Sequence, residues 1–577
     1  MKTDRFSRTI LIFSTIIMVG IITFGVISFI SNYRRNLLSE RFSDSINIEN
    51  DSVYHDVNNI KSWYPMTYNQ QGRLFYLCKV WGFAKYFGKN ENAENVNEIL
   101  MISLDKLLNN NNLDKNNFCE ILQEIISSRQ NDSAKNLYPN INDYALISND
   151  WMSDTVYLND KVKNMLEKMF ENYNGKNVFA TNIGSTGVVK FDKKSDFQDI
   201  TNVCVRLWGL FDYWNAINYF YPNKNFMDLS WDLSLYEAIP RFIEAENEQH
   251  YRMEIYRLTT RLCDSHASLP ATVDTFLFGE YRPEFIMELI DNEFVVNKMR
   301  NPETKNCSFE IGDIILKIDG EDPREFFDSL QAFVCGGNYW SNQYFVCNAM
   351  LSRKESATDF IVLRGDDTLY LKSRNEKSKN LWEKRMKREK RDEKKQLYYW
   401  LDDSTAYLDM TSLTHKNFNN NYFPIKEAQT LILDLRCYPE QMLAVDVADN
   451  FVPSNSIFAN YVYADARYPG MLRLHRQSKR IGTRKCFDGK IIVLVDENTK
   501  SFSEYLTMMI QANPKAAVIG KPTSGAVGNV AFYDFPGEIT TAYTAIGILY
   551  PDLTPTQRSG IKIDSLVETF FGQNKNF

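Results

Sequence analysis

A serine stands between two segments of different periodicity in the last third of the chain. Residues 490–495 form an apolar run typical of a buried strand, and apolar positions recur at helical spacing between Ser501 and Ala512. At a helix N-terminus, free backbone N–H groups and the helix dipole stabilise an alkoxide or an oxyanion. Ser501 is therefore a candidate nucleophile. The alternative is an ordinary helix cap, because Glu504 follows at capping-box spacing.

A nucleophilic serine needs a general base, and the chain has only five histidines. His266 lies in Asp264-Ser265-His266-Ala267, after a helical stretch and before a strand-rich one. A boundary of this kind can face a cleft, although a lone histidine is more often structural. From these residues alone, the pairing of Ser501 with His266 stays open.

Metal and cofactor chemistry is not expected. The nine cysteines include no Cys-x-x-Cys pair, and no His-Glu-x-x-His is present, so neither a zinc site nor a disulfide framework is predicted. The formal net charge of −7 gives no attraction for polyanions, and nucleic acid is not an expected partner.

The elements that must position these residues belong to a multidomain α/β chain. A length of 577 residues predicts several domains, and 44% hydrophobic with 24% charged residues excludes a polytopic membrane protein or a disordered chain. Apolar runs at 430–435, 490–495 and 516–519, with a helix between the last two, predict a parallel α/β core.

The first half contains an internal echo. The pattern Arg-Leu-x-x-Leu-x-x-x-Trp-x-x-x-x-Tyr-Phe begins at Arg73 and recurs at Arg206, with an offset of 133 throughout. Its leucine and tryptophan lie four residues apart, on one face of a helix, so the stripe is assigned to the core. The echo predicts two related helical elements, and the helical pattern continues over residues 199–275.

Two further segments differ from these. Residues 280–375 hold short apolar runs between turns, notably around Gly312 and Gly320, and predict a small β-rich module. The basic-rich run from Arg374 to Lys395 is interpreted as a solvated helix or linker.

The N-terminus predicts a membrane anchor. Residues 9–30 are 22 residues without a charge, which is long enough to cross a bilayer. The first alanine of the chain is Ala84, so no Ala-x-Ala cleavage site follows, and an uncleaved anchor is preferred to a cleaved signal peptide. The rest of the chain would then lie on the extracytoplasmic side, at the cell envelope.

Over roughly residues 200–570 the chain resembles the C-terminal processing and tricorn-like serine peptidases. The matching pieces follow the same order along the chain. They are residues 206–222, Asp264-Ser265-His266-Ala267, Ile311-Gly312-Asp313-Ile314 with Ile318-Asp319-Gly320, Leu433-Asp434-Leu435-Arg436, Ser501-x-Ser503-Glu504, residues 518–525 and Gly560-Ile561-x-x-Asp564.

The resemblance implies a catalytic core of the ClpP/crotonase type, a PDZ-like module, and a choice between two mechanisms. Processing peptidases have a lysine soon after the glycine that is here Gly525, but Ala526 stands there, so a Ser-Lys dyad is missing. The tricorn-like pattern instead implies Ser501 as nucleophile, His266 as base and Ser265 as an orienting residue. Its late acidic residue corresponds to Gln557, which cannot stabilise an imidazolium as a carboxylate does.

The resemblance also implies an oxyanion hole of backbone N–H groups. Family members have glycines shortly after Asp-Leu-Arg, whereas this chain continues through Cys437 and Tyr438. The expected donors are Phe502, next to the nucleophile, and Glu440.

The predicted organisation has seven segments. They are a membrane anchor (1–35), a linker (36–60), an accessory mixed or helical region (61–198), a helical subdomain with the Asp-Ser-His-Ala motif (199–279), the PDZ-like module (280–375), a charged linker (376–398) and the α/β catalytic core (399–577).

These features together predict a membrane-anchored serine endopeptidase that cleaves extracytoplasmic polypeptides through an acyl-enzyme, without a cofactor or metal. The PDZ-like module would bind an extended peptide by strand addition. The alternative is a catalytically silent peptide-binding envelope protein of the same fold. The oligomeric state is left open.

Overall fold

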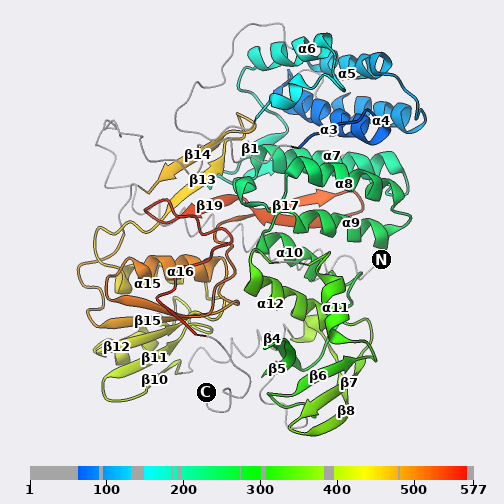
Figure 1. Ribbon diagram of the computed structural model, residues 1–577. Coiled ribbons are helices and arrows are strands. Elements are labelled where there is room, and N and C mark those ends of the chain that lie inside the picture. The colour runs from blue at the N-terminus through cyan, green and yellow to red at the C-terminus, as the bar shows by residue number, and fades with distance from the viewer. Residues whose placement is uncertain are drawn as a thin grey trace.

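The computed structural model describes ten stretches of the chain (Figure 1). They are residues 63–89, 95–130, 148–184, 186–191, 197–272, 274–300, 307–334, 336–381, 396–477 and 481–567. The predicted anchor and its linker up to residue 60 lie outside them. Among the helices of these stretches, none combines the length and the apolar character that a membrane crossing requires.

A six-stranded sheet forms the α/β core. Its strands lie in the order β10 (Tyr398–Trp400), β11 (Thr405–Asp409), β12 (Thr430–Asp434), β15 (Lys490–Val495), β16 (Ala516–Gly520) and β20 (Ser565–Leu566). All neighbours are parallel except β10 and β11. Helices α15 (Leu443–Phe451) and α16 (Phe502–Gln511) follow β12 and precede β16. The predicted parallel α/β core is confirmed, including the helix between β15 and β16.

Two smaller strand groups come from segments that lie between the core strands in sequence, and they were not predicted. One is a three-stranded sheet of β13 (Asn460–Ala464), β14 (Leu472–Arg476) and β19 (Ile546–Leu549). The other is a hairpin of β17 (Val530–Phe535) and β18 (Ile539–Thr544). The hairpin leaves the core and lies against the helices of the N-terminal half (Figure 1). The hairpin therefore contacts a segment that is 321 residues earlier in the chain, since the Tyr533 hydroxyl donates to Asp212.

The N-terminal half is mainly helical. Its elements are α3 (Gln70–Phe87), α4 (Asn95–Leu108), α5 (Lys115–Arg129), η2 (Asp150–Ser153), α6 (Asp160–Glu171), β1 (Ala180–Asn182), β2 (Val189–Phe191), α7 (Val203–Phe220), η3 (Lys224–Phe226), α8 (Trp231–Glu244), α9 (Glu248–Thr260) and α10 (Ser265–Thr272). The helical pattern predicted over residues 199–275 is confirmed.

The sequence echo has a structural reason in two matching helix pairs, α3 with α4 and α7 with α8. The tryptophan of each copy donates its indole N–H to a carbonyl at the start of the following helix, Trp81 to Val96 at 3.0 Å and Trp214 to Trp231 at 2.8 Å.

The arginine of each copy binds the other end of that helix. Arg73 donates to carbonyls just beyond α4, and Arg206 donates to those of Phe242 and Ile243 in the last turn of α8, both at 2.8 Å. Helix C-terminal carbonyls lack partners within the helix, so a buried guanidinium satisfies them. Each copy thus holds the helix that follows it at both ends.

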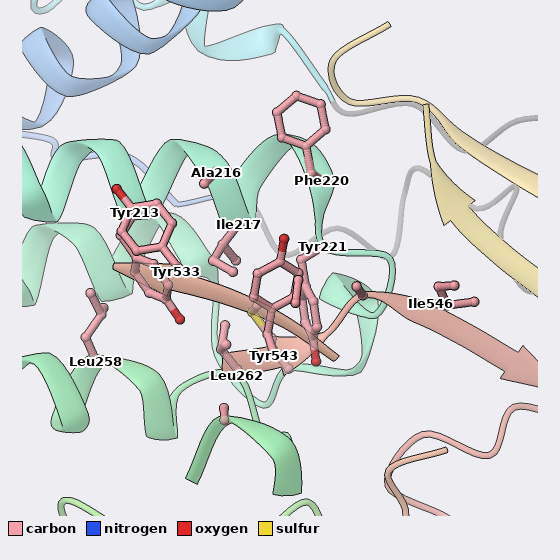
Figure 2. Packing of buried hydrophobic residues seen from close by; sticks show 14 of the residues in the cluster. Tyr213, Ala216, Ile217, Phe220, Tyr221, Leu258, Leu262, Tyr533, Tyr543 and Ile546 are labelled. Atoms are coloured by element: carbon pink, nitrogen blue, oxygen red, sulfur yellow. The ribbon is translucent and has the colours of Figure 1, made fainter. Parts of the chain in front are cut away.

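Aromatic rings fasten the β17–β18 hairpin to the helical layer (Figure 2). The ring of Tyr213 on α7 lies 5.0 Å from that of Tyr533, and the ring of Tyr221 lies 5.9 Å from that of Tyr543 in an edge-on arrangement. All four side chains are buried. Such aromatic pairs add to the burial of their apolar surface, so the hairpin has a rigid support.

The predicted β-rich segment contains a five-stranded antiparallel sheet. Its strands lie in the order β4 (Phe285–Ile290), β5 (Glu293–Met299), β6 (Ile314–Ile318), β7 (Ala357–Arg364) and β8 (Asp367–Arg374), with α11 (Pro323–Leu330) and α12 (Tyr339–Met350) between β6 and β7. The predicted turns on both sides of β6 contain Gly312 and Gly320 with φ of 100° and 85°. The β-rich character is confirmed, and the PDZ likeness stays a prediction.

The predicted charged linker begins with ordered structure. Strand β9 (Glu376–Lys377) pairs with β3 (Tyr281–Arg282). Residues 382–395, the greater part of the linker, lie outside the described stretches.

We expect Arg206→Met to lower the free energy of unfolding of the helical layer by about 2–4 kcal/mol, because four carbonyl acceptors lose a charged donor. Chemical denaturation followed by tryptophan fluorescence measures this. Arg241→Met, on the same α8 but without such bonds in the described chain, is the matched control. Equal stability of the two variants would contradict the conclusion that Arg206 stabilises the end of α8.

Candidate active site

Ser501 lies between β15 and α16, at the strand–helix junction that the sequence predicts, and it occupies a strained turn there. Its backbone has φ +54° and ψ −110°, a region that L-residues with a side chain rarely adopt. Strain of this kind persists only where the surroundings enforce it, and it gathers at functional sites. The turn places the serine at the N-terminus of α16, where an anion is favoured.

The Glu504 carboxylate holds this turn in place. It is fully buried and accepts the backbone N–H of Ser501 at 2.9 Å, which confirms one half of the predicted capping box. It also accepts the Thr523 hydroxyl at 2.6 Å and the N–H groups of Gly525 and Ala526 at 2.8 and 3.2 Å. Burial raises the pKa of Glu504 to about 7, and these hydrogen bonds act against the rise. The Glu504 carboxylate thus joins the turn at Ser501 to the loop of residues 523–526.

The glycine of that loop is required by space as well as by conformation. Gly525 has φ +64°, and a Cβ there would lie 2.6 Å from the carbonyl oxygen of Arg558. Its own carbonyl accepts the Arg558 N–H at 2.8 Å. Ala526 follows at the place of the dyad lysine of processing peptidases, and it is fully buried.

The predicted oxyanion donors lie on two neighbouring segments. The N–H groups of Phe502 and Glu440 donate to no acceptor within the described chain, so both are available. The Thr499 hydroxyl donates to the Leu435 carbonyl at 2.8 Å, and the Ser503 hydroxyl donates to the Cys437 carbonyl. These bonds fasten the nucleophile turn to the segment that leads to Glu440.

Tyr438 is a residue that the sequence interpretation missed. Burial raises the pKa of its hydroxyl, while hydrogen bonds with the side chains of Ser501 and Gln441 lower it. The phenol therefore lies beside the Ser501 side chain. A signal was present, because a tyrosine stands where the resemblance leads one to expect glycine.

His266 is buried near the start of α10, with 3% of its surface exposed. Its Nδ1 lies 2.7 Å from the Thr544 hydroxyl at the end of β18, and its backbone N–H donates to Asp264 at 3.0 Å. Burial lowers the pKa of His266 to about 4, the Asp264 charge opposes this, and the Lys500 charge adds to it. The imidazole is therefore neutral at pH 7.

Lys500 connects the two halves of the site electrostatically. It precedes Ser501, yet its charge acts on His266, and its ammonium lies 5.2 Å from the Phe345 ring on α12. Burial lowers the pKa of Lys500 to about 8, while Glu504 opposes the shift.

The Ser265 hydroxyl joins loops around the site. It donates to the Ser524 carbonyl at 2.7 Å and accepts the Gly337 N–H at 2.9 Å. The Ser524 N–H in turn donates to the Thr499 carbonyl at 3.0 Å, two residues before Ser501. The structure thus links the His266 segment to the nucleophile turn through one intervening residue. The direct pairing of His266 with Ser501 stays a prediction, as does the orienting role of Ser265.

Gln557 is buried, with 4% of its surface exposed. Neither atom of its amide has a hydrogen-bond partner within the described chain. Its predicted orienting role stays a prediction. In the same stretches of chain, no three His, Cys, Asp or Glu side chains lie together as a metal site requires.

Because the turn at Ser501 has a positive φ, we expect Ser501→Gly to be more stable than Ser501→Ala by about 1 kcal/mol. Chemical denaturation of the two variants measures the difference. At Ser329, inside α11, the same pair should show the reverse order, because glycine destabilises a helix. An alanine variant as stable as the glycine variant at position 501 would argue against backbone strain.

Comparison with known proteins gives one family. The profile described as Peptidase family S41 matches residues 404–567. A search of curated proteins gives no match.

Among solved structures, the chain is similar to mature CPAF complexed with lactacystin (12% identity, 64% of this chain, 94% of that chain, TM-score 0.48). It is similar to the photosystem II D1 C-terminal processing protease (14% identity, 65% and 94%, TM-score 0.39) and to the tricorn protease (15% identity, 63% and 34%, TM-score 0.26).

The family match, rather than these distant structural likenesses, supports the assignment. The matched segment begins just before β11 and ends after β20, and it contains the Ser501 turn with Glu504. Residues 404–567 are therefore similar to peptidase family S41, and this match indicates a serine-type peptidase.

Proposed function

We propose that the chain is an endopeptidase in which His266 takes the proton of Ser501 and the alkoxide attacks a peptide carbonyl. The N–H groups of Phe502 and Glu440 hold the oxyanion, and water resolves the acyl-enzyme. The observation that carries the proposal is the strained Ser501 turn at the start of α16, where Glu504 supports it from a buried position.

The charges around the site favour the resting form of this pair. A pKa of about 4 keeps His266 neutral and able to accept a proton. The Lys500 ammonium disfavours the imidazolium but stabilises a negative charge near Ser501. The Asp264 carboxylate acts in the opposite sense and favours the imidazolium.

A second candidate function is that of a silent peptide-binding protein. Gln557, buried without partners within the described chain, offers no negative charge to the imidazole. In this case the protein would bind peptides but would not cleave them efficiently.

The finer features of the proposal concern substrate delivery and location. The sheet β4–β8 has edge strands at β4 and β8, which supports binding of an extended peptide by strand addition. The loop before α12 touches the site through the Gly337 bond to Ser265, so the module could present substrate there. The uncharged segment 9–30 supports membrane anchoring with an extracytoplasmic peptidase part.

We expect a serine-reactive phosphonate to label the purified chain at Ser501. Ser501→Ala should abolish labelling, and His266→Ala should slow turnover by about 10⁴ to 10⁶. Mass spectrometry of the labelled peptide measures the labelling, and peptide hydrolysis measures the turnover. His250→Ala, an exposed histidine on α9, is the matched control and should label normally. A wild-type chain that binds peptides without labelling would favour the silent alternative.

We also expect the rate of phosphonate labelling to fall with decreasing pH only as His266 becomes protonated, near pH 4 rather than near 6.5. Above this pKa the imidazole is neutral and can accept the serine proton. A separate inflection near pH 7 would report Glu504.

Lys500→Met removes a positive charge that lowers the His266 pKa. The acid limb of the pH profile, which is the part where the labelling rate falls with decreasing pH, should therefore move to higher pH. An acid limb near pH 6.5 that does not move in Lys500→Met would contradict the proposal that His266 is the base.

A further inference from the structure

A threonine hydroxyl lies between the His266 ring and a buried carboxylate. Thr544 Oγ1 is 2.7 Å from His266 Nδ1 and donates to Asp264 Oδ1 at 2.8 Å. The Thr544 N–H donates to Asp264 Oδ2 at 2.7 Å. Both Asp264 and Thr544 are fully buried, so solvent does not compete for these bonds.

The donors around Asp264 determine where the protons are. Its carboxylate faces the Thr544 hydroxyl and N–H, the His266 N–H at 3.0 Å and the Tyr221 hydroxyl at 3.3 Å. An ionised carboxylate accepts only, and it satisfies all four donors. The single Thr544 proton then points to Asp264, so Thr544 Oγ1 must accept from His266 Nδ1–H.

This assignment leaves His266 Nε2 without a proton in the neutral ring. A serine hydroxyl can therefore donate to Nε2 and pass its proton there. In Ser-His-Asp sites the carboxylate binds Nδ1–H directly and stabilises the imidazolium that forms. Here Asp264 Oδ1 lies 4.0 Å from Nδ1, and the hydroxyl spans the distance.

We propose that Asp264 and Thr544 are the positioning residues of His266. Through the Thr544 hydroxyl they hold the Nδ1–H tautomer, and they supply the carboxylate that Gln557 lacks. This inference rests on the proposed function for its catalytic meaning, although the tautomer itself exists whether or not the chain cleaves peptides. Of the charged groups near His266, Asp264 favours the imidazolium and Lys500 disfavours it.

The surroundings hold this arrangement rigidly. Asp264 lies on the segment before α10, and Thr544 ends β18 of the hairpin that the aromatic cluster fixes on the helical layer (Figure 2). The Tyr221 ring, whose hydroxyl reaches Asp264, packs edge-on against Tyr543, the neighbour of Thr544. The relay, which is the contact from His266 through Thr544 to Asp264, therefore has both Thr544 and Asp264 in one packed region of the protein.

The test compares Thr544→Val, which removes the hydroxyl at nearly constant volume, with Thr544→Ser, which keeps it. ¹⁵N NMR of the histidine-labelled full chain at pH 7 reports the tautomer, and the signal lost in His266→Ala identifies the ring among five histidines. The wild type and Thr544→Ser should show Nδ1–H with a bare Nε2. Thr544→Val should lose this preference.

Labelling of Ser501 by the phosphonate is the second readout. Thr544→Val should label at least about 10-fold more slowly, and Thr544→Ser should restore the rate. Asp264→Asn should also slow labelling, with the acid limb of its pH profile moved to lower pH, because the imidazolium loses its counter-charge.

The outcomes separate the two proposals. A wild-type ring with the proton on Nε2 overturns the relay, and this measurement stands even if Thr544→Val fails to fold. So does a folded Thr544→Val variant that keeps both the wild-type tautomer and the wild-type rate. A wild-type Nδ1–H tautomer lost in Thr544→Val, in a chain that never labels, supports the relay and overturns the peptidase proposal.

Discussion

The site depends on one buried carboxylate. Glu504 brings together Ser501, the Thr523 hydroxyl and the amides of Gly525 and Ala526, all of which donate to it from inside the protein. Burying this group raises its pKa to about 7, so the arrangement persists only because four donors converge there. The serine turn and the facing loop are consequently one unit, and the strain at Ser501 is sustained by this unit and not by the turn alone.

The histidine side of the site is assembled over a much longer sequence distance. Asp264 and His266 come from the end of the helical layer, whereas Thr544 comes from a hairpin 280 and 278 residues later. The hairpin leaves the α/β core and packs among the helices through Tyr213, Tyr533 and Tyr543 (Figures 1 and 2). The helical half therefore carries His266 and Asp264 and supports the hairpin that ends at Thr544, whereas the α/β core carries Ser501.

Burial keeps His266 neutral at pH 7, and two nearby charges act on it in opposite senses. Desolvation and Lys500 disfavour the imidazolium, and Asp264 favours it. A neutral imidazole suits the proton-accepting role that we propose for His266. Tyr438 adds a buried hydroxyl beside Ser501, on the segment where the sequence resemblance leads one to expect glycine.

The local elements could be predicted from the amino-acid sequence. The strand–turn–helix around Ser501, the helices with the repeated arginine and tryptophan, and the strand-rich module were all visible in periodicities of two or 3.6 residues. The order of short motifs also gave the resemblance to serine peptidases that the family match of residues 404–567 supports. The role of Thr544 and the position of the β17–β18 hairpin had no such signal. Both depend on how the chain folds, because Thr544 contacts His266 across 278 residues of sequence and no local pattern encodes such a contact.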